Sequence, residues 1–158
     1  MFFTPFKIMK NVLRSIAVVA ALLVFAGAAQ AEFAKPAQAV HYRKSVFYVM
    51  GHHTAILGAM LEGRIPFDTQ RALSEAQIIE FMSHLPWRAF GPGTDARGTD
   101  AKSSIWHERQ RFQADAQALE RLTPRLTAAA QTGQLSQMRV VFGQTVKTCK
   151  SCHDSFRN

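Results

Sequence analysis

The sequence is poor in cysteine and shows little that is typical of β-structure. It contains only two cysteines among its 158 residues, so a zinc site built from two cysteine pairs is excluded. No stretch alternates apolar and polar residues with a period of two, and Val/Ile-rich runs are absent after residue 31. Internal repeats and low-complexity tracts are absent as well. These absences predict an all-α protein.

The first 31 residues have the layout of a secretory signal peptide. Basic residues precede an apolar run at residues 15–28, and the run ends in small residues up to Ala31. The run is shorter than the ~20 residues that a membrane-spanning helix requires. We therefore expect cleavage between Ala31 and Glu32, and a mature domain at residues 32–158 with no membrane segment.

The basic character of the chain is milder than its formal net charge of +8 indicates. Without residues 1–31 it has 16 Lys and Arg against 11 Asp and Glu, a formal charge of +5. These side chains form no basic stripe of the kind that lies along nucleic acid. We expect an ordinary solvated surface and no nucleic-acid partner.

The domain divides into four helical segments separated by turn signals. The first covers about residues 36–62, and the second follows the N-cap residue Asp68 and ends near residue 85. The third covers about 104–130, and the fourth runs from 135 to the C-terminus. Short connections join the first pair and the last pair, and a long loop joins the middle two. This order predicts an antiparallel four-helix bundle.

Two details of this bundle are predicted from local sequence. Pro124 lies inside the third segment and is expected to kink or divide the helix there. The first segment has apolar residues on two stripes, so we expect one side to face the bundle and the other a partner chain. The stripe expected to face a partner consists of Val46, Val49, Ile56 and Met60.

The most informative motif is Cys149-Lys150-Ser151-Cys152-His153, a C-x-x-C-H sequence near the C-terminus. Cysteines three residues apart on a helix point to the same side, about 5–6 Å apart. Two thiols so placed can add to the two vinyl groups on one edge of a haem. The histidine that follows then supplies an imidazole to the iron. The motif predicts one covalently attached haem c per chain, with His153 as the iron ligand.

Three other interpretations of the motif are weaker. A redox dithiol usually opens a helix in a βαβ setting, which this sequence does not have. Half of a zinc site has no second cysteine pair to complete it. A structural disulfide is not needed in a bundle of this size.

The C-terminal haem motif and several short segments resemble the cytochrome c′ family, the class II c-type cytochromes. Class I cytochromes c carry their haem motif near the N-terminus, so the C-terminal position of the motif in this chain is the strongest part of the resemblance. The resemblance covers about residues 32–157. Its segments are Phe33-Ala34-Lys35-Pro36, Tyr42-Arg43-Lys44-Ser45, Leu85-Pro86-Trp87, Phe90-Gly91-Pro92-Gly93-Thr94, Ile105-Trp106, and Cys149 to Asp154 with Phe156-Arg157.

The resemblance implies a five-coordinate, largely high-spin iron in the bundle. It places Arg157 beside the proximal imidazole, where the alternative is a solvated charge that favours the helix dipole. It places Arg43, followed by Lys44, among the residues that bind the haem, with the Arg43 guanidinium on a propionate. The alternative for Arg43 is an exposed helix charge.

The resemblance also implies which residues cover the distal face of the haem. Phe47 falls where high-spin members have an apolar cap, leucine in many of them, and where low-spin relatives have a methionine ligand. Trp87 and Phe90 match aromatics that line the haem, although core packing alone also explains them. Met50 lies about 60° further round the helix and is an alternative axial ligand, although a methionine on such a stripe is more often core. His53 is expected at an interface or on the surface.

These residues predict a periplasmic, non-enzymatic protein that binds nitric oxide and carbon monoxide at an open iron. A pocket closed by Phe47 offers no hydrogen-bond donor, which disfavours stable binding of dioxygen. The alternative is an electron-transfer cytochrome without a ligand-binding role. The resemblance further implies a homodimer. The redox partner is not predicted.

Overall fold

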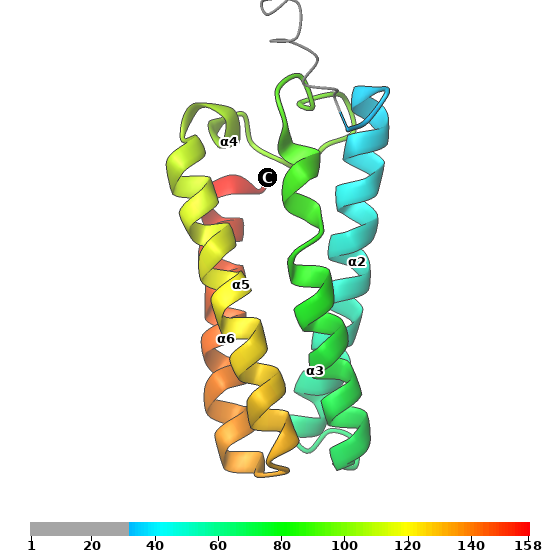
Figure 1. Cartoon of the computed structure of the whole chain (residues 1–158), viewed down its shortest axis with the longest axis vertical. Helices are drawn as coiled ribbons and strands as arrows, with labels where there is room; N and C mark the ends of the chain where they lie inside the picture. Colours follow the sequence, from blue (N-terminus) through cyan, green and yellow to red (C-terminus); the bar gives the residue numbers. More distant parts are fainter. Residues whose placement is uncertain (1–31) are drawn as a thin grey trace, which may run out of the picture. The chain divides into compact units, whose positions relative to one another are not determined.

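The computed structural model describes residues 32–158, and the predicted signal peptide lies outside the described residues. Four long helices run lengthwise through this part of the chain (Figure 1). They are α2 (Pro36–Leu61), α3 (Thr69–Ser83), α5 (Arg109–Gln131) and α6 (Leu135–Phe156). Between α3 and α5 lie a 3₁₀ helix, η1 (Pro86–Phe90), and the short helix α4 (Ser104–His107). No β-strand occurs between residues 32 and 158.

The helices pack in chain order, as the predicted four-helix bundle requires. α2 packs on α3, α3 on α5, and α5 on α6, while a smaller contact between α2 and α6 closes the bundle. Gly58 permits this last contact, because a Cβ atom there would lie 3.1 Å from the ring of Phe142. Gly133, with φ of +67°, makes the tight turn between α5 and α6. None of the helices formed by residues 32–158 has the length and apolar character to cross a membrane.

The termini of the helices follow from local sequence. The Asp68 side chain accepts a hydrogen bond from the Arg71 backbone N–H at 2.6 Å, which confirms Asp68 as the N-cap of α3. Pro36 occupies the first turn of α2, where its missing N–H has no helical acceptor to satisfy.

Pro124 does not divide the third segment. α5 continues through Pro124, and the predicted segment is divided instead at Glu108, whose φ of −104° and ψ of 41° are not helical. Pro124 is exposed, so its ring extends into solvent and the core side of α5 stays intact. The break at Glu108 separates α4 from α5.

One of the two stripes of α2 differs in part from its prediction. Val46 and Met60 were expected to face a partner chain, but they are 7% and 1% exposed and belong to the interior of this chain. They are buried because α2 contacts α3, η1 and α6 and is thus covered on more than one side. The exposed apolar residues of α2 and α3 are Tyr48 and Phe81, which lie on neither stripe.

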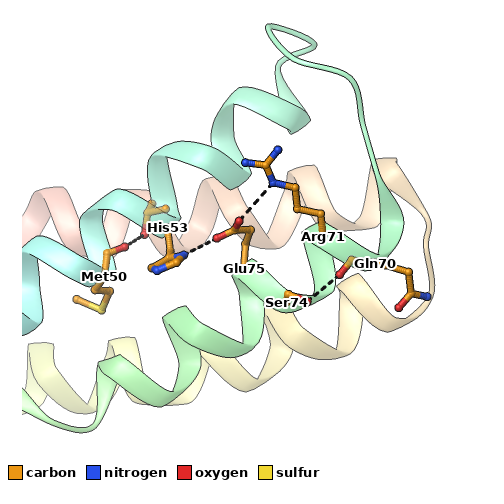
Figure 2. A network of polar contacts seen from close by, with 7 residues as sticks. Met50, His53, Gln70, Arg71, Ser74 and Glu75 are labelled. Carbon is orange, nitrogen blue, oxygen red and sulfur yellow. Dashed lines mark hydrogen bonds and ion pairs between the residues drawn. The ribbon is translucent and has the colours of Figure 1, made fainter.

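A buried carboxylate links α2 to α3. Glu75 lies between His53 and Arg71, with 2.5 Å from its Oε2 to His53 Nδ1 and 3.6 Å from its Oε1 to Arg71 Nε (Figure 2). His53 thus has a contact within the chain that the sequence did not predict, and its expected place at an interface stays a prediction. Its imidazole is a hydrogen-bonding partner for the Glu75 carboxylate, which would be costly to bury without one.

Candidate haem site

α6 carries the two cysteines on the side that faces the bundle. Cys149 packs against the main core cluster, and Cys152 packs against a separate cluster of aromatic residues. Both thiols are half-buried. Burial raises the pKa of Cys149, and burial together with the charge of Asp115 raises the pKa of Cys152 to about 11. The thiols thus face apolar surroundings in which they are neutral.

The aromatic cluster fills the end of the bundle where α6 ends. Phe90 and Phe112 lie 4.9 Å apart between ring centroids, and Phe112 and Phe156 lie 5.5 Å apart. These rings come from η1, α5 and α6, so three elements distant in sequence meet beside Cys152. Edge-to-face arrangements at such distances stabilise aromatic pairs beyond simple burial.

Phe47 of α2 completes this cluster and also reaches His153 of α6. Its ring centroid lies 5.8 Å from Trp87, 6.3 Å from Phe90 and 6.4 Å from the imidazole of His153. Four residues assigned to the haem from the sequence are thereby brought together. Met50, the alternative ligand, is buried in the main core cluster.

The two indole N–H groups of this region both donate hydrogen bonds to backbone carbonyls. Trp87 Nε1 donates to the Ser83 carbonyl at 2.6 Å. Trp106 Nε1 donates to the Gly91 carbonyl at 3.0 Å. Each bond satisfies a donor that would otherwise be unpaired in an apolar environment. Neither indole has a second N–H to offer a ligand.

Arg43 holds the loop that follows η1. Its Nη1 donates to the Ala89 carbonyl at 2.6 Å and to Thr94 Oγ1 at 3.3 Å, and its Nη2 donates to the Thr94 carbonyl at 2.9 Å and to Thr99 Oγ1 at 2.7 Å. The guanidinium also lies 4.5 Å from the ring centroid of Phe90. Only 2% of the residue is exposed, and burial lowers the pKa of Arg43 against the opposing charge of Asp95.

The structure thus gives Arg43 a role that its sequence position did not indicate. The exposed-charge alternative is wrong, because the side chain is buried. All four N–H groups of Nη1 and Nη2 donate to protein acceptors, so the Nε N–H is the donor left for a haem propionate. The contact with a propionate stays a prediction.

The remaining two predicted site residues are exposed. Lys44 donates to the Gly98 carbonyl at 3.1 Å and pairs with Asp100 at 3.4 Å. Arg157 ends α6, and its backbone N–H bonds to the His153 carbonyl. Partial burial lowers the pKa of His153, the Arg157 cation lowers it further, and Asp154 acts in the opposite direction. The predicted place of Arg157 beside the imidazole stays a prediction.

The side chains at this end of the bundle fit a haem held by two thioether bonds. Two neutral thiols on one helical face, an imidazole beside them and a shell of aromatic rings are the chemistry that a large apolar macrocycle needs. Cys149 and Cys152 would form the covalent bonds, and His153 would bind the iron. The fold and the site together define a c-type cytochrome of the four-helix-bundle class.

Comparisons with known proteins give the family. A family model described as cytochrome C′ matches residues 38–157. The chain is 38% identical over 127 residues to cytochrome c′ of Rubrivivax gelatinosus, covering 80% of this chain and 98% of that protein. Cytochrome c′ of Alcaligenes xylosoxydans xylosoxydans is 37% identical over 126 residues, covering 80% and 98%. The chain belongs to the cytochrome c′ family, and it carries one haem c.

Solved structures agree with this assignment. The crystal structure of cytochrome c′ from Rubrivivax gelatinosus matches with a TM-score of 0.78 and covers 80% of this chain and 100% of that one. The nitric oxide complex of a leucine-to-alanine variant of cytochrome c prime from Alcaligenes xylosoxidans is 38% identical. It matches with a TM-score of 0.76 and covers 80% of this chain and 98% of that one.

Sequence reasoning missed several members of the site. Phe112 and Phe156 lie in the third and fourth predicted helical segments, but helical periodicity alone did not assign them to the cluster around Cys152. Trp106 belongs to a segment that resembles the family, yet its bond to Gly91 was not foreseen. Thr94 could not be found, because its role as an acceptor for Arg43 depends on tertiary contact.

Proposed function

We propose that this protein binds nitric oxide and carbon monoxide at a five-coordinate haem iron. When bound, the haem supplies a ferrous iron with one free position, at which both gases bind without needing a hydrogen bond. One observation carries the proposal: the Phe47 ring lies 6.4 Å from the His153 imidazole, and the neighbouring indole N–H of Trp87 donates to the Ser83 carbonyl. A phenyl ring donates no lone pair to the iron, so it leaves the sixth position open.

The same arrangement favours these gases over dioxygen. Dioxygen gains negative charge on binding, and a distal donor is needed to stabilise it. Phe47 and Phe90 have no hydrogen-bond donor in their side chains, and the single indole N–H of Trp87 already donates to the Ser83 carbonyl. The nitric oxide complex of the relative from Alcaligenes xylosoxidans supports the ligand class.

The substitution Phe47→Ala tests this proposal. Removal of the ring opens space on the side of His153 from which a ligand approaches, so we expect faster carbon monoxide binding to the ferrous protein and a lower dissociation constant. Phe81→Ala is the matched control, because it removes an equal ring from a side chain that is 65% exposed. Stopped-flow mixing with carbon monoxide measures both. Equal kinetics in Phe47→Ala, Phe81→Ala and the parent protein would contradict the role given to Phe47.

The absorption spectrum separates this proposal from the electron-transfer alternative. A broad high-spin spectrum that shifts on adding gas is expected for an open iron. Sharp low-spin bands that gas does not change would mean a second protein ligand, with Met50 the first to replace. Electron transfer without ligand binding would then be the better description.

We propose further that the protein is a periplasmic homodimer without enzymatic activity. The signal-like residues 1–31 support export, and fractionation of cells tests it. The rings beside Phe47, those of Trp87 and Phe90, are neither acids nor bases, which argues against acid–base catalysis. Tyr48, which is 78% exposed on α2, supports self-association through that helix. Sedimentation of the haem-loaded protein measures that state.

A further inference from the structure

The formal charge of the domain is divided unevenly between its two halves. Residues 32–108, which include α2 and α3, have eight basic and eight acidic side chains. Residues 109–158, which form α5 and α6, have eight basic side chains and only three acidic ones. The entire excess of +5 therefore lies on the half that carries the haem motif. Its basic residues are Arg109, Arg111, Arg121, Arg125, Arg139, Lys147, Lys150 and Arg157.

The outer side of α6 combines this charge with exposed apolar groups. Val140 is 63% exposed and Val146 is 40% exposed. Gly143, between them, has open space where a side chain would stand. Lys147 and Lys150 follow at helical spacing, so apolar and basic groups share one side of the helix. Lys147 is exposed, and Lys150 pairs with Asp154 at 2.6 Å, so Lys147 is the main cation that this side offers to a partner. We call Val140, Gly143, Val146, Lys147 and Lys150 the outer α6 face. An apolar centre with a charged rim is the usual anatomy of a transient protein interface.

The outer α6 face is centred on the opposite side of the helix from the haem-attaching thiols, and Val146, at its edge, lies about 60° from Cys149. Cys149 falls about 160° round the helix from Lys147, at 100° per residue. Its side chain packs into the core, and Lys147 is exposed. A partner seated on this face is separated from the thiols by one helix, whose diameter with side chains is about 10–12 Å.

We propose that the outer α6 face docks an acidic electron-transfer protein that exchanges one electron with the haem. Charge complementarity selects the occupant, because the net charge of +5 on residues 109–158 attracts a negative partner and the neutral half of the domain does not. In the exchange the partner's cofactor loses one electron and ferric iron becomes ferrous, and no covalent bond forms or breaks. The proposal depends on the haem and not on gas binding.

The test is reduction of the haem-loaded ferric protein by flavodoxin hydroquinone, an acidic one-electron donor, without any gas. The second-order rate constant is measured by stopped flow from 10 mM to 300 mM ionic strength. We expect it to fall by about tenfold or more over this range, because salt screens a steered encounter. Lys147→Glu is expected to lower the rate constant about fivefold at 10 mM, where the Debye length is ~30 Å.

Two controls make the result specific to the outer α6 face. Arg64→Glu changes the net charge by the same amount at an exposed site on the other half of the domain, and it should leave the rate nearly unchanged. A small neutral flavin radical, generated by flash photolysis, should reduce all three proteins equally and show that the haem is intact. A rate constant that ignores salt, or equal losses in Lys147→Glu and Arg64→Glu, would overturn the proposal.

Discussion

Replacing Arg43 by methionine removes four hydrogen bonds from one buried position while keeping most of the side-chain volume. The guanidinium bonds to the carbonyls of Ala89 and Thr94 and to the hydroxyls of Thr94 and Thr99. The Thr94 hydroxyl keeps its own bond to the Gly91 carbonyl. The two carbonyls that lose a donor therefore account for most of the expected cost.

The magnitude follows from the loss of donors to buried groups. A buried acceptor left without its partner costs about 1–3 kcal/mol, and hydrogen bonds to a charged group lie at the upper end. The two carbonyls, together with the lost contact of the cation with the Phe90 ring at 4.5 Å, give about 3–5 kcal/mol. For a domain of this size the corresponding fall in Tm is roughly 10–20 °C.

The assay is urea unfolding of the haem-loaded protein, followed by circular dichroism. Amide hydrogen exchange is measured in parallel, because Arg43 is expected to protect residues 89–99 more than the four helices. Arg43→Lys, which retains the charge but not the planar fork, should recover part of the loss. Lys44→Met is the matched control, because Lys44 is exposed and its loss should cost under about 1 kcal/mol.

Either of two results would refute this reasoning. One is a loss under about 1 kcal/mol for Arg43→Met, equal to that of Lys44→Met. The other is a large loss with unchanged exchange at residues 89–99, which would assign the stabilisation to some other contact.

Two further predictions concern the helices. Asp68→Ala should lower the free energy of unfolding by about 1 kcal/mol, because the Arg71 N–H loses its acceptor. Asp68→Asn keeps an acceptor and should differ from the parent protein by only about a few tenths of a kcal/mol. Equal losses for the two variants in urea unfolding would contradict the role of Asp68 as the N-cap. Pro124→Ala should raise the free energy of unfolding by about 1–2 kcal/mol and raise the Tm with it. Alanine restores a backbone N–H inside α5, and this gain exceeds the stability lost because the unfolded chain becomes more flexible without proline. A lower Tm in calorimetry would show instead that the proline ring stabilises α5.

Helix positions were predictable because they depend on short-range patterns. The predicted start of the fourth segment at residue 135 agrees with α6, since Gly133 breaks the chain just before it. The division at Glu108 was missed because Ile105 and Phe112 are seven residues apart, a spacing that also fits one continuous helix. A periodic pattern reports which residues are buried, and it does not report a local turn between them.

The haem site shows the same distinction. Cys149, Cys152 and His153 form a contiguous motif, so their chemistry is encoded within five residues. Two of the four acceptors of Arg43 are backbone carbonyls 46 and 51 residues away in sequence. Every residue has a carbonyl, so no side-chain pattern marks these two as acceptors. Such contacts become known only when the loop after η1 is placed against α2.

The geometry of α6 separates the two roles that we propose for the haem. Its inner side carries Cys149 and Cys152 into the apolar bundle, where the proposed gas-binding site lies. Its outer side presents Lys147 to solvent, where the positive charge is expected to raise the association rate of an acidic partner. Since the two sides share no side chain, a substitution such as Phe47→Ala should change gas kinetics and leave the salt dependence of reduction intact. Lys147→Glu should do the reverse, and an effect of either variant on both measurements would show that ligand binding and electron exchange are coupled.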